Sequence, residues 1–258
     1  MTIGAQLYTV RAYTQTENDF DGCMKKIGEI GYTCVQVSAI GNIPAERVKT
    51  ICKKYGLEVV LTHTNPERIL TDTDAVIADH KTTGTKFIGI GGLPEQYRTD
   101  AAAINKFAAD YLPAAKKIAA AGMKFMYHNH HFEFEKYDGV LIIDRLADLF
   151  PKELMGFIVD TYWVQAGGAD PAYTIEKFAG RAEAIHFKDM KIIRDDNGHV
   201  QQAMCPILEG NLNWPAIFKA CEKAGVEYAF IEQDDCYGED PFDCLATSYD
   251  NLGKYGYK

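Results

Sequence analysis

The stretch Ala120–His128, "AAGMKFMYH", contains the junction that decides the fold. A segment of helical periodicity ends here at Gly122 and a short apolar strand follows, and glycine is the residue that most readily takes the left-handed conformation ending a helix. The same junction recurs along the chain as "EIGYTC" (29–34), "KYGLEV" (54–59), "TTGTKF" (82–87) and "KAGVEY" (223–228). This recurrence predicts a repeated unit in which each helix leads into the next strand.

Outward from these junctions, eight short apolar runs alternate with eight segments of helical periodicity. The expected strands are Ile3–Leu7, Cys34–Ser38, Glu58–His63, Lys86–Gly91, Lys124–His128, Gly156–Thr161, Ala184–Lys188 and Tyr228–Gln233. The expected helices are Phe20–Ile30, Ala45–Tyr55, Asp74–Thr82, Asp100–Ala121, Leu141–Phe150, Pro171–Phe178, Pro215–Ala224 and Pro241–Lys254. Alternation without a linker-like break predicts parallel strands with right-handed crossovers. Eight such units predict a single (β/α)8 TIM-barrel domain over residues 1–258.

An open, doubly wound sheet is the alternative α/β architecture. Its G-x-G-x-x-G fingerprint is missing after the first strand. The glycine-rich segment Ile88–Pro94, "IGIGGLP", lacks the lysine and the helix start of a phosphate-binding loop, so we interpret it as a strand end and tight turn. The pattern therefore favours the closed barrel.

Composition narrows the class of partner and the compartment. The formal net charge is −9 and the sequence contains no basic patch, which argues against binding a polyanion such as DNA. The seven cysteines include no C-x-x-C pair, a pattern typical of free thiols in a reducing compartment. The N-terminal residues do not resemble a signal peptide, and no apolar run reaches the roughly 18 residues of a membrane span. We therefore expect a cytoplasmic protein that binds neither nucleic acid nor membrane.

Chemically capable side chains occur at the ends of the predicted strands. They are His63 on strand three, His128 and His130 on strand five, Asp160 on strand six, His186 and Lys188 on strand seven, and Glu232 on strand eight. The loops after the strands of a (β/α)8 barrel converge on one rim, where the active site lies. The distribution therefore predicts a single site at that rim.

Three of these residues suggest a metal site. Asp160, His186 and Glu232 each follow apolar residues near the end of a buried strand, where an unpaired charge costs several kcal/mol. A single aspartate or histidine near a strand end is more often a helix cap or a hydrogen-bonded polar group than a metal ligand. Several of them on adjacent strands favour binding of one shared ion. One divalent cation, bound also by a carboxylate from strand five, would compensate them, and mixed nitrogen and oxygen ligands suit Mn²⁺, Zn²⁺, Fe²⁺, Co²⁺ or Mg²⁺.

Three segments then show a family resemblance. They are "HNHHFEF" (128–134), "VDTYWVQAGGADPAYTIEKFAGRAEAIHFKD" (159–189) and "LEGNLNWPAIFKACEKAGVEYAFIEQD" (208–234). In order and spacing they resemble the sugar phosphate isomerase/epimerase family of the xylose isomerase-like barrels. The first half of the chain adds mainly "GAQLYTVR" and "THT", so the specific resemblance is confined to about residues 127–235.

The resemblance implies a metal held by glutamate, aspartate, histidine and glutamate. Asp160, His186 and Glu232 match three of these positions, but His128 stands where epimerases of the family have the strand-five glutamate. Members with the H-N-H-x-F-E-F form use the glutamate five residues on. The resemblance therefore implies Glu133 as the fourth ligand, with His128 as the alternative.

The remaining candidates have roles in catalysis and substrate binding. Glu232 or a nearby histidine would remove a proton from the substrate, and His130 is a candidate proton carrier. Lys188 would stabilise an oxyanion or move a proton. The expected substrate-binding residues are His63, His128, Trp163 as an apolar wall, and Arg194 for a phosphate group if the sugar carries one.

The residues and the resemblance together imply a metal-dependent isomerase or epimerase, and the resemblance supplies the substrate class, a sugar or keto-sugar that reacts through an enediolate-type intermediate. The alternative is a lyase or hydratase acting on 3-keto-glycosides or inososes. An endonuclease for abasic DNA with three zinc ions would need more ligands than the sequence offers, and a non-catalytic barrel subunit would hold no tightly bound metal. A homo-oligomer is compatible with the sequence.

Overall fold

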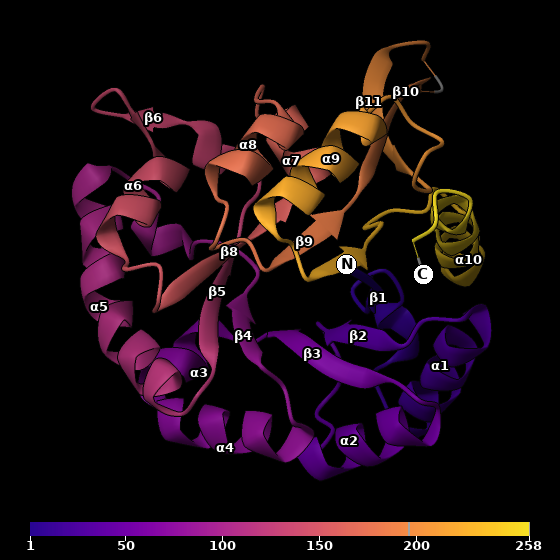
Figure 1. The fold of residues 1–258 in the computed structure, drawn as a ribbon, viewed down its shortest axis with the longest axis horizontal. Helices are drawn as coiled ribbons and strands as arrows, with labels where there is room; N and C mark the ends of the chain where they lie inside the picture. The colour runs from indigo at the N-terminus through magenta and orange to yellow at the C-terminus, as the bar shows by residue number, and fades with distance from the viewer. Residues whose placement is uncertain (196, 258) are drawn as a thin grey trace.

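A closed barrel of eight parallel strands forms the centre of the molecule in the computed structural model, which describes residues 1–195 and 197–257 (Figure 1). The barrel strands are β1 (Thr2–Gln6), β2 (Cys34–Val37), β3 (Glu58–His63), β4 (Phe87–Ile90), β5 (Lys124–His128), β8 (Met155–Asp160), β9 (Ala184–Phe187) and β12 (Tyr228–Ile231). β12 pairs with β1 and closes the barrel. The predicted (β/α)8 fold is confirmed; residues 196 and 258 of the predicted domain lie outside the described residues.

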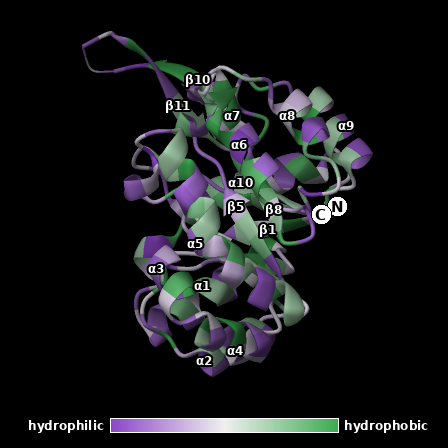
Figure 2. Ribbon diagram, turned by 90° about the vertical axis from the view of Figure 1, so that its left-hand side faces the viewer, coloured by the Kyte–Doolittle hydropathy of each residue, from purple (hydrophilic) through white to green (hydrophobic). Residues whose placement is uncertain are grey.

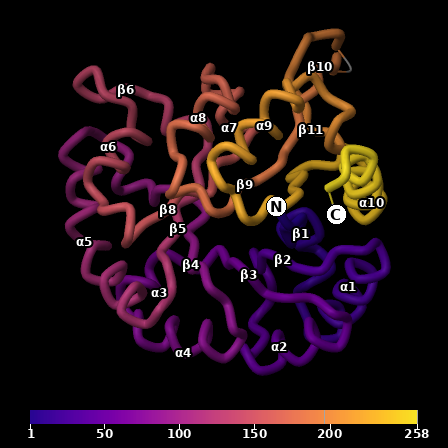
Figure 3. Tube along the Cα trace, viewed as in Figure 1, coloured from indigo at the N-terminus to yellow at the C-terminus, as the bar shows by residue number. Residues whose placement is uncertain are grey.

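Helices form a ring around this barrel (Figures 1 and 3). They are α1 (Glu17–Ile30), α2 (Ala45–Lys54), α3 (Pro66–Thr71), α4 (Thr73–Thr83), α5 (Ala101–Ala120), α6 (Ile142–Leu149), α7 (Thr161–Ala166), α8 (Pro171–Lys177), α9 (Trp214–Ala224) and α10 (Pro241–Gly253), with short 3-10 turns η1 (Arg11–Tyr13), η2 (Glu95–Tyr97) and η3 (Phe132–Phe134). Each predicted helix corresponds to one of these. The sequence pattern did not predict α3 and α7, which have only six residues each.

The junction glycines act as the sequence indicates. Gly31, Gly84 and Gly225 cap α1, α4 and α9 in the left-handed conformation, with φ of 119°, 82° and 73°. Gly122, in the junction before β5, has φ 80°. At these turns the chain reverses from a helix directly into the next strand. The barrel strands are parallel, so their carboxyl ends lie at one rim.

Two antiparallel hairpins interrupt the repeat. β6 (Lys136–Tyr137) pairs with β7 (Val140–Leu141), and β10 (Asp189–Arg194) pairs with β11 (Val200–Cys205). Figure 2 shows the β10–β11 hairpin projecting from the body of the molecule. The predictions included neither hairpin, and the second carries the loop in which Arg194 was expected to bind substrate.

Apolar side chains form two layers. One cluster comes from strands around the barrel: Cys34, Val60, Leu61, Phe87, Met126, Ile158, Ala184 and Phe230. A larger cluster packs the outer faces of the strands against the helices. Gly4 leaves room for the inner layer, because a Cβ at this position would lie 2.6 Å from the ring of Phe230. The site described below lies where this inner layer gives way to polar residues.

All seven cysteines are free thiols, and all but Cys236 are buried. Within the described residues, none of the helices combines the length and the apolarity needed to cross a bilayer.

Candidate functional site

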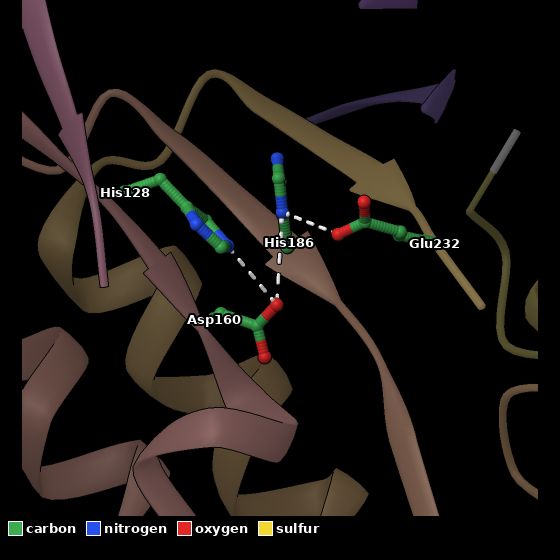
Figure 4. Close-up of side chains that lie close together, drawn as sticks. All are labelled: His128, Asp160, His186 and Glu232. Atoms are coloured by element: carbon green, nitrogen blue, oxygen red, sulfur yellow. Dashed lines mark hydrogen bonds and ion pairs between the residues drawn. The ribbon is translucent and has the colours of Figure 1, made fainter. Parts of the chain in front are cut away.

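Four buried side chains from consecutive barrel strands converge at the carboxyl ends of those strands (Figure 4). His128 ends β5, Asp160 ends β8, His186 lies in β9, and Glu232 directly follows β12. Each offers one ligand atom, and these atoms all lie within 4.8 Å of one another. We call these four residues the metal-type group. Asp160, His186 and Glu232 were expected to meet in this way, with Glu133 as the fourth member.

The closest contacts within the group join imidazole nitrogens to carboxylate oxygens. His186 Nδ1 lies 2.8 Å from Glu232 Oε2 and 3.6 Å from Asp160 Oδ2. His128 Nε2 lies 3.3 Å from Asp160 Oδ2. Among the described residues, no hydrogen bond of good geometry reaches His186 Nδ1, so its 2.8 Å approach to Glu232 Oε2 is an ion-pair contact that needs a proton or a cation at these atoms.

The outer hydrogen bonds of the two histidines orient their lone pairs toward the carboxylates of the group. His186 Nε2 lies 2.8 Å from the amide oxygen of Gln36, which can only accept, so Nε2 carries the proton. His128 Nδ1 likewise faces the carbonyl oxygen of Gly91 at 3.3 Å. In the neutral rings, His186 Nδ1 and His128 Nε2 therefore turn lone pairs toward carboxylate oxygens. Only a cation or an added proton makes this arrangement favourable, so the group fits a metal ion.

The charges at the site agree with this conclusion. Burial works against ionisation of Asp160 and Glu232, but the Lys188 ammonium together with His128 and His186 outweighs it and holds the pKa of both carboxyls well below the usual range. Burial lowers the pKa of His128. For His186, burial acts in the same direction, but the carboxylates of Glu232 and Asp160 overcome it and raise the pKa. The negative charge around the His186 imidazole therefore favours a proton or a cation bound at this ring.

Lys188 lies among three carboxylates and is only 1% exposed. Its Nζ is 3.1 Å from Asp160 Oδ2, 2.9 Å from Glu232 Oε2 and 3.0 Å from Asp234 Oδ2. Burial opposes its charge, yet these carboxylates raise its pKa above the ordinary value. Asp160 and Glu232 are ionised and Asp234 is partly ionised near neutral pH, so one ammonium leaves net negative charge at the site, which a bound cation would balance.

Sequence reasoning missed three residues that support this site. Gln36 orients His186, Gln6 donates its amide to Glu232 Oε1 at 2.9 Å, and Asp234 lines the cavity beside Lys188. Burial and the charge of Glu232 raise the pKa of Asp234 to about 7. The sequence contains a sign of each residue's role. Gln6 and Gln36 are polar residues within apolar strands, and Asp234 is two residues after Glu232, a spacing that in a strand puts both side chains on one face.

Glu133 does not belong to the metal-type group, contrary to expectation. It is fully buried in η3, where its Oε1 accepts from the Tyr127 hydroxyl at 2.7 Å and its Oε2 accepts from the backbone N–H of His130 at 2.7 Å. Burial raises its pKa to about 7. Because the chain turns after β5, the Glu133 side chain lies outside the metal-type group, and its two hydrogen bonds hold the loop after β5 in place. The strand-five position in the group belongs to the alternative, His128.

A cavity of about 460 Å³ opens onto the group and includes His63, His128, His130, Trp163 and Lys188 in its wall. We call it the catalytic cavity. Among the described residues His130 Nδ1 has no hydrogen-bond partner, and burial lowers the pKa of this imidazole to about 3, so the ring is neutral. The Trp163 ring forms an apolar wall with the Lys188 ammonium 5.4 Å from its centroid. The His63 ring lies 5.1 Å from that of His128.

Arg194 is not among the residues that line this cavity. It ends β10, is exposed, and donates to the carbonyl oxygen of Gly198 at 2.7 Å. Arg194 therefore stabilises the turn of the hairpin, because the predicted loop after strand seven is in fact a β-hairpin that carries it outward.

Comparison with known proteins agrees with this fold. The family profile described as xylose isomerase-like TIM barrel matches residues 24–235. A search of curated proteins gave no significant match. Similar solved structures include a sugar phosphate isomerase/epimerase from Parabacteroides distasonis ATCC 8503 (20% identity, TM-score 0.81, covering 97% of this chain and 93% of that chain). An L-ribulose 3-epimerase has 14% identity and a TM-score of 0.72, with coverage of 98% and 94%.

A further similar structure is described as "IOLI protein with a binding zinc atom" (11% identity, TM-score 0.70, covering 98% of this chain and 97% of that chain). Structural likeness at these identities shows the fold, whereas the family profile covers most of the sequence itself. This chain belongs to the family of xylose isomerase-like TIM barrels.

Proposed function

We propose that this protein is a divalent-metal-dependent isomerase or epimerase that acts on a sugar or keto-sugar. One observation carries the proposal: two imidazole lone pairs and two ionised carboxylates face one buried point beside a cavity of about 460 Å³. The cavity is of a size that holds a small ligand. Similar structures described as a sugar phosphate isomerase/epimerase and an L-ribulose 3-epimerase support the substrate class.

His128, Asp160, His186 and Glu232 would hold the metal ion. With His128 in place of a carboxylate, the ligands are two nitrogens and two oxygens. This set suits Zn²⁺, Mn²⁺, Fe²⁺ or Co²⁺ better than Mg²⁺, which prefers oxygen ligands. A bound divalent ion supplies Lewis acidity toward a carbonyl and an adjacent hydroxyl oxygen, and this makes the carbon between them easier to deprotonate.

The protein's own side chains would perform the proton transfers. Glu232 is ionised, lines the catalytic cavity and can accept a proton from the substrate carbon. Lys188 remains an ammonium, so it acts as a hydrogen-bond donor to an oxygen that gains negative charge. His130 presents an unpartnered Nδ1 that would accept a hydrogen bond from a sugar hydroxyl, because its pKa of about 3 makes the ring a poor proton carrier near neutral pH, while His63 and Trp163 would hold the sugar.

The alternative is a lyase or hydratase that removes the same proton and then loses a substituent at the neighbouring carbon, as from a 3-keto-glycoside or inosose. A second cavity beside the catalytic one favours this alternative, because it gives room for a leaving group. For either activity we propose a small-molecule substrate and no nucleic acid, given the net charge of −9. The seven free thiols support a cytoplasmic location.

Deuterium exchange tests the proposed function. Protein loaded with Mn²⁺ or Zn²⁺ is incubated with a panel of keto-sugars in D₂O, and NMR follows deuterium at the carbon beside the carbonyl. We expect enzyme-dependent exchange with at least one sugar and none with Asp160→Asn, which lacks a ligand charge. Accumulation of an eliminated product would identify the lyase. A fully metal-loaded protein that exchanges deuterium into no sugar would contradict both activities.

A further inference from the structure

A second cavity of about 350 Å³ lies beside the catalytic cavity, between α2 and α4. The two cavities have five wall residues in common: Ser38, Ala39, His63, Thr64 and Asn65. His63 ends β3 and the other four belong to the segments that follow β2 and β3, at the same end of the barrel as the metal-type group. The two cavities are therefore adjacent, and these five residues form the junction between them.

The second cavity suits an uncharged, partly apolar group. Its walls include Ile40, Ile43 and Val48. Arg68 and Asp79 also line it, but they form an ion pair at 2.6 Å, so they present no net charge to a ligand. The volume accommodates one ring of six atoms and its substituents.

The junction presents a hydrogen-bond acceptor whose direction the structure fixes. His80 Nδ1 donates to the carbonyl oxygen of Val76 at 2.7 Å, and burial lowers the pKa of His80, so its Nε2 is an acceptor. The Thr62 hydroxyl, 2.8 Å away, must donate to Nε2. Thr62 Oγ1 then accepts from the Thr64 hydroxyl at 2.9 Å. Thr64 has used its proton and offers a lone pair to both cavities, as a sugar hydroxyl requires.

The other side of the junction is a strained loop held in place. Ala39 has φ 54°, in the left-handed region that favours glycine. The Gln15 side chain donates to the carbonyl oxygens of Ala39 at 2.8 Å and Arg11 at 2.7 Å. Gly41 packs so tightly here that a Cβ would lie 1.9 Å from the Gln15 carbonyl oxygen. These contacts fix the position of the loop at the junction of the two cavities.

We propose that the second cavity binds an uncharged ring attached to the reacting sugar, so that the substrate is a keto-glycoside, with the carbonyl on the reacting sugar, rather than a free monosaccharide. The reacting sugar lies at the metal-type group, one of its hydroxyls donates to Thr64 Oγ1, and the attached ring lies against Ile40, Ile43 and Val48. This inference rests on the proposed function, because it assumes that a sugar occupies the catalytic cavity.

Paired ligands test the inference by calorimetry on the Mn²⁺-loaded protein. The probes are the methyl and phenyl β-glycosides of glucose, galactose and xylose, and the corresponding 3-keto-glycosides. We expect the phenyl member of at least one pair to bind about tenfold or more tightly than the methyl member, because the phenyl ring buries apolar surface. Ala45→Phe, which fills the second cavity from α2, should remove this gain and leave the methyl glycoside affinity unchanged.

Two further variants guard against a folding artefact. Ile43→Asn makes the wall polar without filling the cavity and should also reduce the phenyl gain. Ala78→Phe places the same new side chain on the exposed surface of α4 and should keep the full gain. Circular dichroism and metal content verify that each variant is folded.

The outcomes separate the two proposals. Equal binding of methyl and phenyl members, or a phenyl gain that survives both Ala45→Phe and Ile43→Asn, would overturn the glycoside inference and leave the proposed function standing. Failure of every sugar to bind would instead count against the proposed function and the inference together.

Discussion

His186 donates its Nε2–H to the amide oxygen of Gln36 across 2.8 Å, and this bond leaves Nδ1 as a lone pair facing Asp160 and Glu232. Gln36 comes from β2, which is not a neighbour of β9 in the barrel. The orientation of a central imidazole therefore depends on a residue from a distant strand. Outer partners of this kind fix the tautomer of metal-binding histidines.

Gln36→Leu should weaken metal binding by about 10- to 100-fold, because the His186 ring loses the partner that sets its tautomer. Competition titration of Zn²⁺ with a chromophoric chelator measures the change. Gln233→Leu is the matched control, since Gln233 is an equally buried glutamine whose amide bonds to the Asp235 carbonyl and not to the metal-type group. Equal affinities for the Gln36 variant and the wild type would show that the bond has no part in metal binding.

Substitutions of His128 and of Glu133 should affect metal affinity differently, because only His128 lies in the metal-type group. His128→Ala should lower metal affinity by about 100-fold or more, because it deletes a nitrogen ligand. Glu133→Gln should leave the affinity within about threefold, since the carboxylate only braces the loop. The same chelator competition measures both. The reverse order of effects would restore Glu133 as the ligand.

Glu133 should also make the stability of the metal-free protein depend on pH. Its folded pKa of about 7 lies above the ordinary value of 4.5, so between these values the folded state holds a proton that the unfolded state has lost. Stability therefore falls as pH rises through this window and the loss is complete above it, by about 3 kcal/mol in total. Glu133→Gln removes this contribution.

Urea unfolding in the presence of a chelator measures this effect. The free energy of unfolding of Glu133→Gln minus that of the wild type should increase from about pH 4.5 to about pH 7.5 and then level off. Parallel pH profiles for the two proteins would show that Glu133 titrates normally.

Lys188→Met should separate metal binding from catalysis. The variant removes the cation that balances Asp160, Glu232 and Asp234, so the metal-free protein should lose about 3–5 kcal/mol of stability. Added Mn²⁺ should restore much of this loss, because it supplies the missing charge. The rate of deuterium exchange should nevertheless fall by about 100-fold or more, since the donor to the developing oxyanion is gone. An active variant would exclude Lys188 from catalysis.

The sequence was a sufficient guide to the barrel because its signals are local and repeated. A glycine such as Gly122 ends a helix directly before a buried strand, and each repeat of that pattern adds one unit. Asp160, His186 and Glu232 could be predicted for the same reason: each lies at or next to the end of a strand, and a closed barrel brings such ends to one rim. These predictions required only the order of elements.

The missed features depend on loop geometry or on distant contacts. Glu133 and His128 differ by five positions, and which of them reaches the centre depends on the turn after β5, which periodicity does not reveal. The predicted loop after strand seven is the β10–β11 hairpin, which places Arg194 outside the wall of the catalytic cavity, and "DDNG" (195–198) is a hairpin signal in the sequence. The role of Gln36 follows only from a contact across the barrel.

Metal stoichiometry tests the central claim most directly. The purified protein is stripped with a chelator, titrated with Zn²⁺ or Mn²⁺ by calorimetry, and compared with Asp160→Asn and His186→Ala. The account predicts one tightly bound divalent ion per chain in the wild type and a loss of about 100-fold or more in affinity in each variant. A folded wild-type protein that binds no divalent ion, or variants that bind it equally well, would contradict the claim that these strand ends form a metal centre.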